Sequence, residues 1–220
     1  MFNEIIDKEY AISNNSFSEG TQEKYYKDGY WYKIDQTGCE SYAEFLTSKL
    51  LELSDILPDK YVKYEMGKIN GKQGCRSKSF LKPGETFITI YRLYQTLYGK
   101  NISDEIALLP LDEKYKFVNE FIYKETGLNP KEVFSFLFNV DAFTLNDDRH
   151  FNNIGFVKRN DNTYNAAPIF DNGRGFLNGN ISYNKNFSIQ ENCNRVVAKP
   201  FCGDHVKWHY IIKIKRICTL

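Results

Sequence analysis

The alternation of hydrophobic and polar positions predicts strands in the first part of the chain. Two aromatic, β-prone runs flank the dipeptide Asp28-Gly29, which is typical of a tight hairpin turn. We therefore expect antiparallel strands over about residues 22–27 and 30–35. Lys33 lies inside the second of these strands.

After Cys39 the spacing of apolar positions changes to that of a helix. Apolar side chains recur three or four positions apart as far as Leu53, which predicts an amphipathic helix over residues 39–53. Glu40 and Glu44 lie four positions apart on one helical face, and Glu44 is beside the apolar stripe. Glu40 complements the dipole of the first turn. Glu44 is either a surface charge or an acid that reaches back to the sheet.

Two more strands are expected before the pattern breaks. Residues 61–66 alternate between apolar and polar, and residues 74–81 form the return strand after an Asn-Gly turn. A Pro-Gly pair beginning at Pro83 interrupts the pattern. We expect a mainly β first lobe over residues 1–85.

The remainder, residues 86–220, is mainly helical in pattern. Residues 113–126 carry one apolar stripe, and Gly127 suits the end of this helix. Asn129-Pro130 is a typical start for the next helix. That helix is apolar nearly all round, a pattern typical of a helix buried at the centre of a lobe.

Two short strands are predicted after this helix, over residues 154–157 and 167–170. A polar connection with Asn162 at its turn separates them. A hairpin brings the start of its first strand close to the end of its second. We therefore expect Asn153 and Asp171 to be neighbours.

Three oxygen-bearing side chains stand beside these elements, namely Asp148, Asn153 and Asp171. Mg²⁺ accepts few protein oxygens and completes its shell with phosphates and water, so Asn153 and Asp171 suit a Mg²⁺ site. Asp148 is then positioned to orient an incoming hydroxyl. Any one of them alone is also an ordinary turn residue. Together they favour an ATP-dependent kinase, in which Lys33 is either a solvated strand lysine or a cation for the nucleotide phosphates.

Composition and charge fit a soluble globular protein. The 220 residues carry a formal net charge of +1, so no global field favours nucleic acid or a membrane surface. No stretch approaches the roughly 18 apolar residues of a membrane span. The five cysteines lack CxxC spacing, and the first residues do not resemble a secretory signal. We expect free thiols in a reducing cytoplasm.

Three motifs resemble a known family. The sequence Asp-Arg-His-Phe-Asn-Asn from Asp148 to Asn153 resembles the Asp-Arg-His-x-x-Asn catalytic motif of HipA-like kinases and of the phosphoinositide 3-kinase-like group. Residues 167–173 resemble their metal-binding segment, most closely in the HipA-like branch. Residues 18–24 are similar to the HipA-like nucleotide loop, and the resemblance covers residues 16–202. It implies an α+β, two-lobed protein-kinase-like fold with a small β-rich N-lobe and a mainly helical C-lobe.

The resemblance implies roles for the residues of the second lobe. Asp148 would be the catalytic base, and Asn153 and Asp171 would be the Mg²⁺ ligands. Arg149 and His150 would be structural members of the catalytic loop, with His150 hydrogen-bonded rather than acting as a base.

In the first lobe the resemblance implies an ATP-binding set. Lys33 would hold the α- and β-phosphates, and Glu44 would pair with Lys33. Gly20 belongs to the nucleotide loop. Ser79 to Leu81 fall where family members bind adenine through the hinge backbone.

The chain departs from larger family members in two respects. HipA toxin kinases usually carry an additional N-terminal subdomain and several helices after the metal-binding Asp. Here the nucleotide loop begins within the first twenty residues, and fewer than fifty residues follow Asp171. We expect a minimal form without that subdomain and with an abbreviated C-lobe. Family members can autophosphorylate a loop serine, for which Ser16 and Ser18 are the candidates.

The leading hypothesis is a HipA-like serine/threonine protein kinase that uses ATP and Mg²⁺ and acts on an unidentified protein substrate or on itself. A toxin component with a cognate antitoxin partner is one form of this hypothesis. A lipid or small-alcohol kinase of the phosphoinositide type is an alternative, because it shares the catalytic motif. A pseudokinase that binds nucleotide without turnover is a third.

Overall fold

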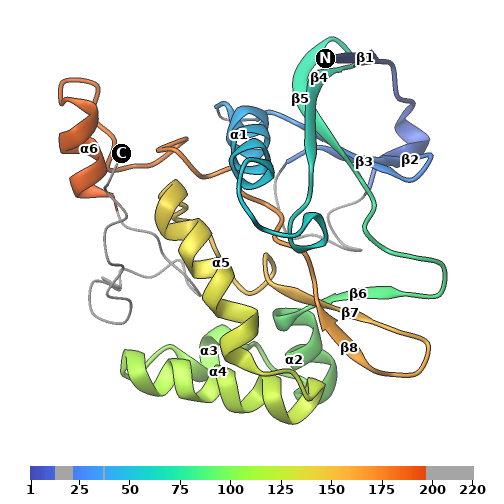
Figure 1. The fold of residues 1–220 in the computed structure, drawn as a ribbon, viewed down its shortest axis with the longest axis vertical. Coiled ribbons are helices and arrows are strands. Elements are labelled where there is room, and N and C mark those ends of the chain that lie inside the picture. Colours follow the sequence, from blue (N-terminus) through green and yellow to red (C-terminus); the bar gives the residue numbers. More distant parts are fainter. Residues whose placement is uncertain (13–21, 37, 197–220) are drawn as a thin grey trace.

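The computed structural model describes residues 1–12, 22–36 and 38–196. These residues form a sheet-rich lobe and a mainly helical lobe (Figure 1). The first sheet has the strand order β1-β4-β5-β3-β2, with β1 parallel to β4 and the other pairs antiparallel. The elements of this lobe are β1 (Phe2–Glu4), η1 (Lys8–Tyr10), β2 (Lys24–Lys27), β3 (Tyr30–Ile34), α1 (Glu40–Glu52), η2 (Pro58–Lys60), β4 (Tyr64–Ile69) and β5 (Lys72–Lys78).

Two hairpin turns shape this sheet, and both were expected from the sequence. Asp28 and Gly29 have φ values of 51° and 78°, and Asn70 and Gly71 have φ values of 51° and 79°. Asn, Asp and Gly tolerate this left-handed region, which two-residue hairpin turns require. The strands expected at residues 61–66 and 74–81 were placed imperfectly. The observed strands run right up to the Asn70-Gly71 turn, so that β4 ends at Ile69 and β5 begins at Lys72.

The second lobe contains a three-stranded sheet in the order β6-β7-β8 and most of the helices. The strand β6, which pairs antiparallel with β7, was not expected from the sequence. The elements are β6 (Thr86–Thr89), α2 (Ile90–Tyr98), α3 (Ile102–Ile106), α4 (Leu111–Thr126), α5 (Pro130–Thr144), β7 (Gly155–Lys158), β8 (Tyr164–Ala166) and α6 (Ile189–Arg195).

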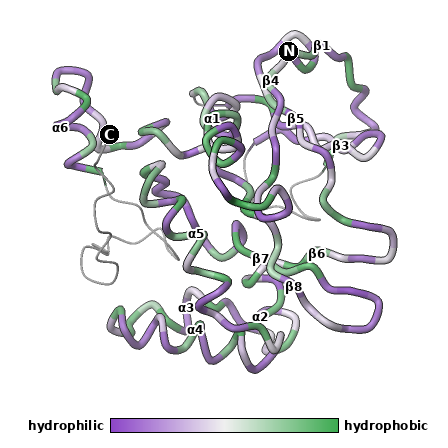
Figure 2. Tube along the Cα trace, viewed as in Figure 1, coloured by the Kyte–Doolittle hydropathy of each residue, from purple (hydrophilic) through white to green (hydrophobic). Residues whose placement is uncertain are grey.

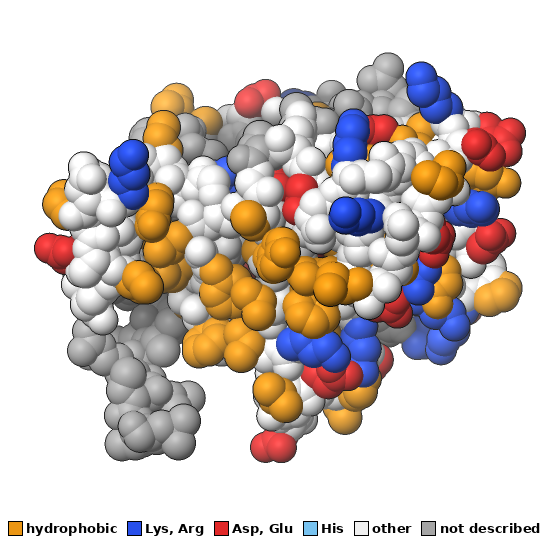
Figure 3. Space-filling view, turned by 90° about the horizontal axis from the view of Figure 1, so that it is seen from above, with side chains coloured by type: hydrophobic (Ala, Val, Ile, Leu, Met, Phe, Trp, Pro, Cys, Tyr) orange, Lys and Arg blue, Asp and Glu red, His pale blue; other side chains and the backbone are white. Residues whose placement is uncertain are grey.

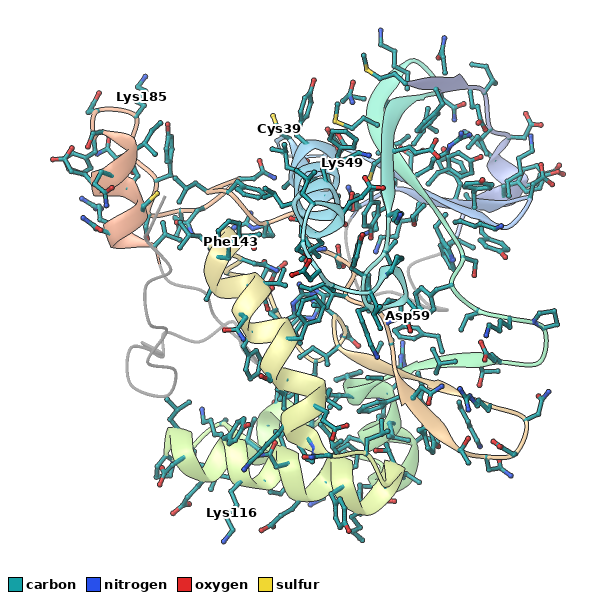
Figure 4. The ribbon with its side chains drawn as sticks, in the orientation of Figure 1. Cys39, Lys49, Asp59, Lys116, Phe143 and Lys185 are labelled. Atoms are coloured by element: carbon teal, nitrogen blue, oxygen red, sulfur yellow. The ribbon has the colours of Figure 1, made fainter. Side chains whose placement is uncertain are left out.

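Local capping chemistry sets the bounds of the two long helices. The helix α4 ends at Gly127, whose φ is 71°, and α5 begins after Asn129, whose side chain accepts a hydrogen bond from Lys131 N at 3.1 Å. The expectation that α5 is apolar nearly all round and buried at the centre of a lobe was wrong along one face, where Ser135, Asn139 and Phe143 are exposed. Phe143 is 71% exposed and lies at the upper end of α5 (Figure 4).

The strand expected at residues 167–170 was also wrong. The strand β8 lies earlier, and Ile169 instead forms a parallel bridge with Tyr61 of the first lobe. The backbone N–H of Ile169 donates to Lys60 O, and that of Val62 donates to Ile169 O, both at 2.8 Å. This segment therefore ties the approach to Asp171 to the sheet lobe, and a strand pattern alone did not reveal the partner.

The helix α1 turns its apolar stripe outward. Tyr42 and Leu46 are each 45% exposed, and hydrophobic side chains gather at the centre of the face seen in Figure 3. The buried side of α1 is mostly small and polar, and it packs against β4 and β5. Apolar helical stripes normally face a core. Here the buried positions are Ser41, Ala43, Glu44, Thr47, Ser48 and Leu51.

Hydrophobic stretches converge where α5, α2, β6 and β7 meet, and the hairpin tips are mostly hydrophilic (Figure 2). On β3, Tyr32 and Ile34 enter an apolar cluster on one side of the sheet, so the intervening Lys33 projects to the opposite side. Its neighbour Cys75 lies on that same opposite side. The alternation along β3 thus aims Lys33 at the space between the lobes.

The boundary expected at residue 85 stays a prediction, although the first sheet ends at Lys78 and the second begins at Thr86. Gly20, Ser16 and Ser18 lie outside the described residues, as does the chain after residue 196. Within the described ranges, no helix combines the length and apolar character that crossing a membrane requires.

Candidate active site

Three charged side chains from distant segments meet between the lobes. Lys33 Nζ of β3 lies 2.8 Å from Glu44 Oε1 of α1 and 2.9 Å from Asp171 Oδ1. Lys33 and Asp171 are 138 positions apart in the sequence. The Glu44 side chain is 2% exposed and that of Asp171 is 28% exposed. The lysine thus bridges an enclosed carboxylate and a more accessible one.

The ion pairs decide the charge states of this cluster. Burial opposes the ionisation of Asp171, but the positive charges of Lys33 and Lys24 outweigh it and hold the pKa of Asp171 well below its usual range. Burial likewise opposes the charge on Lys33, but Asp171 and Glu44 raise its pKa well above the ordinary value. Both groups are therefore charged at neutral pH.

Backbone contacts orient the two carboxylates. The N–H of Asn172 donates to Glu44 Oε2 at 2.8 Å, so Glu44 is bonded on both oxygens. Asp171 has a φ of 58°, which is uncommon for a residue other than glycine. Its N–H donates to the Tyr64 hydroxyl at 3.4 Å, and Lys33 Nζ lies 5.5 Å from the centre of the Tyr64 ring.

The segment after Asp171 also reaches the start of α1 and the loop that follows α5. Asn178 accepts a hydrogen bond from Cys39 N at 3.0 Å, and its side-chain amide donates to Gly173 O at 2.7 Å. Asp147 accepts from Asn180 at 2.6 Å. The position of α1, and with it Glu44, is therefore coupled to the segment that carries Asp171.

The loop that follows α5 is held by its own side chains. The helix ends at Leu145 with a φ of 54°, and Asn146 then donates to Asp141 Oδ1 at 3.0 Å. Asn146 Oδ1 accepts from Asp148 N at 3.2 Å, and Asn153 Nδ2 donates to Asp148 O at 2.9 Å. These bonds fix the backbone on both sides of Asp148.

Arg149 connects this loop to the segment before Asp171. Its side chain is fully buried, and its Nε and Nη2 donate to the Asp141 carboxylate at 2.9 Å each. Its Nη1 donates to the carbonyls of Asn153 at 3.2 Å and Phe170 at 2.6 Å. Its Nη2 also donates to Asn172 Oδ1 at 2.7 Å. The contacts agree with the structural role expected for Arg149.

The carboxylate of Asp148 lies in a different environment from the guanidinium of Arg149. The Asp148 side chain is exposed, yet the protein around it removes part of its hydration and so raises its pKa. His150 opposes this shift and the negative charge of Asp171 adds to it. His150 Nδ1 accepts a hydrogen bond from Asn152 N at 3.2 Å. A carboxylate with a raised pKa is a better proton acceptor, which suits a general base.

The residues expected to bind Mg²⁺ supply suitable donors. Asp171 is ionised, and Asn153 contributes an amide whose nitrogen is already bonded to Asp148 O, so its oxygen is directed elsewhere. A carboxylate and an amide oxygen are ligands that Mg²⁺ accepts. Arg149 Nη1 brings the Asn153 and Phe170 carbonyls to one nitrogen, so the two ligand-bearing segments meet. The donor set thus fits the metal.

Three aromatic rings pack together beside the segment expected to bind adenine. Phe80, Phe87 and Phe170 contact one another, with ring centroids 5.6 Å, 5.4 Å and 6.5 Å apart. Ser79 N donates to Gly29 O at 2.8 Å, and Leu81 N approaches Ser79 Oγ at 3.4 Å. The adenine contacts expected for Ser79 and Leu81 stay a prediction.

The sequence did not reveal three residues of this site. Asp141 had a usable signal, since it is an acidic residue inside an otherwise apolar helix. Asn172 had none beyond its place in the motif. Lys24 was recognised only as the last residue of the nucleotide loop, and its nearness to Lys33 follows from strand register.

No protein-family model matches this sequence, and no curated protein matches it either. Among solved structures, the fold is similar to the crystal structure of a proinflammatory kinase, CtkA, from Helicobacter pylori, with a TM-score of 0.52 and 20% sequence identity. The match covers 72% of this chain and 54% of that chain, so it spans about half of the kinase. The described part of the protein therefore has a two-lobed, kinase-like α+β fold.

Proposed function

We propose that this protein is an ATP-dependent kinase of the HipA-like serine/threonine type. The observation that carries the proposal is the position of Lys33, which bonds to both Glu44 and Asp171 at the junction of the lobes. Phosphoryl transfer needs positioning and charge stabilisation more than covalent chemistry, and this cluster supplies charges of both signs. The kinase-like fold supports the same class of reaction.

Each residue has a defined part in the proposed reaction. Lys33 binds the α- and β-phosphates of ATP, while Glu44 keeps the ammonium group in place. Asp148 accepts the proton of the attacking hydroxyl as its oxygen bonds to the γ-phosphorus, while the bond from that phosphorus to the β–γ bridging oxygen breaks and ADP leaves. Asn153 and Asp171 would hold Mg²⁺, which would supply positive charge to neutralise the nucleotide phosphates.

The acceptor and the partners are separate proposals. We place a protein serine or threonine, either of another protein or of this chain, as the acceptor, and the cytoplasm as the location. The sequence motif supports this acceptor, together with the alternative of a lipid or small alcohol, whereas the location rests on cysteines without CxxC spacing. A toxin role with an antitoxin partner rests on the HipA resemblance alone.

Phosphate transfer from γ-labelled ATP tests the proposal. The purified protein with Mg²⁺ should label itself or a generic protein acceptor such as casein. Asp148→Asn and Asp171→Asn should remove the label, and Asp161→Asn, in the exposed turn before β8, should retain it. Labelling that persists in both site variants would contradict the proposal.

A thermal-shift measurement separates the enzyme from a pseudokinase. A ligand that binds the folded state raises the melting temperature, so ATP with Mg²⁺ should stabilise the protein in either case. Stabilisation without transfer to protein, lipid or small-alcohol acceptors would favour the pseudokinase. No stabilisation would remove support for both.

A further inference from the structure

Asn172 lies between the buried arginine of the second lobe and the buried acid of the first. The residue is itself buried, and its Oδ1 accepts a hydrogen bond from Arg149 Nη2 at 2.7 Å. On its other side, Nδ2 donates to Glu44 Oε2 at 3.4 Å, and the backbone N–H donates to the same oxygen at 2.8 Å. One residue thus contacts a cation and an anion that belong to different lobes.

The amide of Asn172 suits this position chemically. An amide carries an acceptor and a donor on separate atoms, so it can face a guanidinium and a carboxylate at once without a charge of its own. A carboxylate at this place would repel Glu44. An apolar side chain would leave a buried N–H of Arg149 without its acceptor, which is costly.

The two neighbours of Asn172 are anchored in different parts of the fold. Arg149 is held by the Asp141 carboxylate of α5 at 2.9 Å from both Nε and Nη2, so the acceptor of Asn172 has a fixed partner. Glu44 belongs to α1 of the other lobe. The chain passes close to this helix directly after Asn172, because a Cβ added at Gly173 would lie 3.3 Å from the Cβ of Glu40. The position of the catalytic loop is therefore passed to α1 at Asn172.

We propose that Asn172 is a positioning residue for the Lys33–Glu44 ion pair, which aligns Glu44 with the Arg149 scaffold and thereby sets the affinity for nucleotide. This inference rests on the proposed function and deepens it. Within the described ranges the bonds of Lys33 Nζ go to Glu44 and Asp171, and none goes to Asn172. The effect of the Asn172 side chain on the ammonium group must therefore pass through Glu44.

Asn172→Asp isolates the contact with Glu44. The new carboxylate keeps the size of the side chain and an acceptor for Arg149, but it places a negative charge where the amide placed a donor. Glu44 should move away, and Lys33 should lose its enclosed partner. In calorimetric titration with Mg²⁺, ADP and a non-hydrolysable ATP analogue should bind roughly tenfold to a hundredfold more weakly, the range that a hydrogen bond to a charged group is worth.

Adenosine separates positioning from general damage. It has no phosphate for Lys33 to bind, so Asn172→Asp should leave its affinity unchanged. A loss for adenosine as large as the loss for ADP would indicate a merely structural role and would overturn the inference. Equal affinities of wild type and Asn172→Asp for ADP and the analogue would overturn it as well.

A double-mutant cycle tests whether the effect passes through Glu44. Glu44→Gln keeps an oxygen for Lys33 and can turn its amide nitrogen toward the new carboxylate of Asn172→Asp. In the Glu44→Gln background, Asn172→Asp should therefore weaken ADP less than about threefold. Equal losses in the two backgrounds would contradict the inference.

The matched control is a buried amide outside the site. Asn192 of α6 is fully buried, and its Nδ2 donates to the backbone oxygens of Asn184 at 2.9 Å and Phe187 at 3.2 Å. Asn192→Asp makes the same chemical change away from Lys33. It should lower the melting temperature and leave the affinity for ADP unchanged. An ADP loss equal to that of Asn172→Asp would show that position does not matter, against the inference.

Chemical denaturation of the same four proteins supplies a readout without nucleotide. Because Asn172→Asp brings two carboxylates together, its loss of stability should be smaller in the Glu44→Gln background than in wild type. If Asn172→Asp does not fold alone, the double variant should fold, and a double variant that also fails to fold would contradict the inference. If wild type itself binds no ADP or ATP analogue, the proposed function fails, a result distinct from normal binding by Asn172→Asp.

Discussion

Two cations in this protein, the buried Arg149 and the half-buried Lys33, use charge in opposite ways. Arg149 directs all five of its N–H donors at protein acceptors, on the side chains of Asp141 and Asn172 and on two carbonyls. Lys33 bonds to Glu44 and Asp171, and the side chain of Asp171 is 28% exposed. A saturated guanidinium has no donor left for a ligand, whereas an ammonium beside an accessible carboxylate can exchange partners. The first arrangement suits a scaffold and the second suits a binding site.

The largest effect is expected for the scaffold. Arg149→Met leaves the Asp141 carboxylate buried without its partner, and such a loss destabilises a protein by about 3–5 kcal/mol. Arg149→Lys should also be destabilising, because an ammonium cannot reproduce five donors in a planar fork. Chemical denaturation measures both, with Arg92→Lys as the control, at a half-buried arginine whose bond to Gln95 is exposed. Stability of Arg149→Met within about 1 kcal/mol of wild type would show that the hydrogen bonds of Arg149 do not hold these segments together.

At Asp148, the proposed general base, a change should affect the rate strongly and folding little. Asp148→Asn keeps the size of the side chain, and the loss of a general base is worth about 10²–10⁴-fold in rate. ADP affinity and the melting temperature should stay close to wild type. A variant with unchanged kcat would refute the assignment of Asp148.

The pH dependence sharpens the same assignment. A base works when ionised, so kcat/KM should fall as the pH drops through the pKa of Asp148 in the free enzyme. Desolvation by the surrounding protein raises that pKa above 3.8, so the acid limb should lie at higher pH than for an aspartate in an unstructured peptide. A rate profile with its acid limb at or below 3.8 would contradict this expectation.

A smaller loss of stability is expected at the exchangeable cation. Lys33→Met should reduce stability by roughly 2–3 kcal/mol, because Glu44 keeps its bond from Asn172 and Asp171 can turn toward water. It should also remove most of the affinity for ADP. Lys63→Met, at an exposed lysine paired with Glu52, is the control. Unchanged ADP binding would show that Lys33 does not contact phosphate.

Acid unfolding tests whether the Lys33–Asp171 ion pair stabilises the folded protein. The pKa of Asp171 is lowered in the folded state, so the pair contributes its full stability above the unfolded value of about 3.8. That contribution is lost as the pH falls below 3.8 toward the folded pKa. The stability difference between wild type and Lys33→Met should therefore shrink in that acid range. A constant difference would contradict the ion pair.

The smallest effect is expected at Tyr64. Its hydroxyl accepts a long hydrogen bond, 3.4 Å, from Asp171 N, and its ring lies near Lys33 Nζ. Tyr64→Phe keeps the ring and should change stability by about 0.5 kcal/mol and ADP affinity less than twofold. A larger loss would mean that the hydroxyl, and not Lys33 alone, positions Asp171.

The sequence by itself determined the features that depend on neighbouring residues. The turns at Asp28-Gly29 and Asn70-Gly71 and the caps at Gly127 and Asn129 follow from local backbone and side-chain preferences. Asp148, Asn153 and Asp171 could be selected from their spacing, and Lys33 and Glu44 from the family resemblance, although the roles of all five stay predictions. Turns and caps can be predicted from the sequence because the residues that interact lie within a few positions of one another.

Only the tertiary structure decided which of these residues meet. The ion pair between Lys33 and Asp171 joins residues 138 positions apart, and the five bonds of Arg149 depend on packing of α5 against two loops. The outward stripe of α1 has the same origin, because Glu44 faces the sheet that carries its partner. A buried charge needs a partner of opposite charge, and the fold can supply that partner from any part of the chain. The spacing of residues along the sequence therefore does not predict which charges will pair.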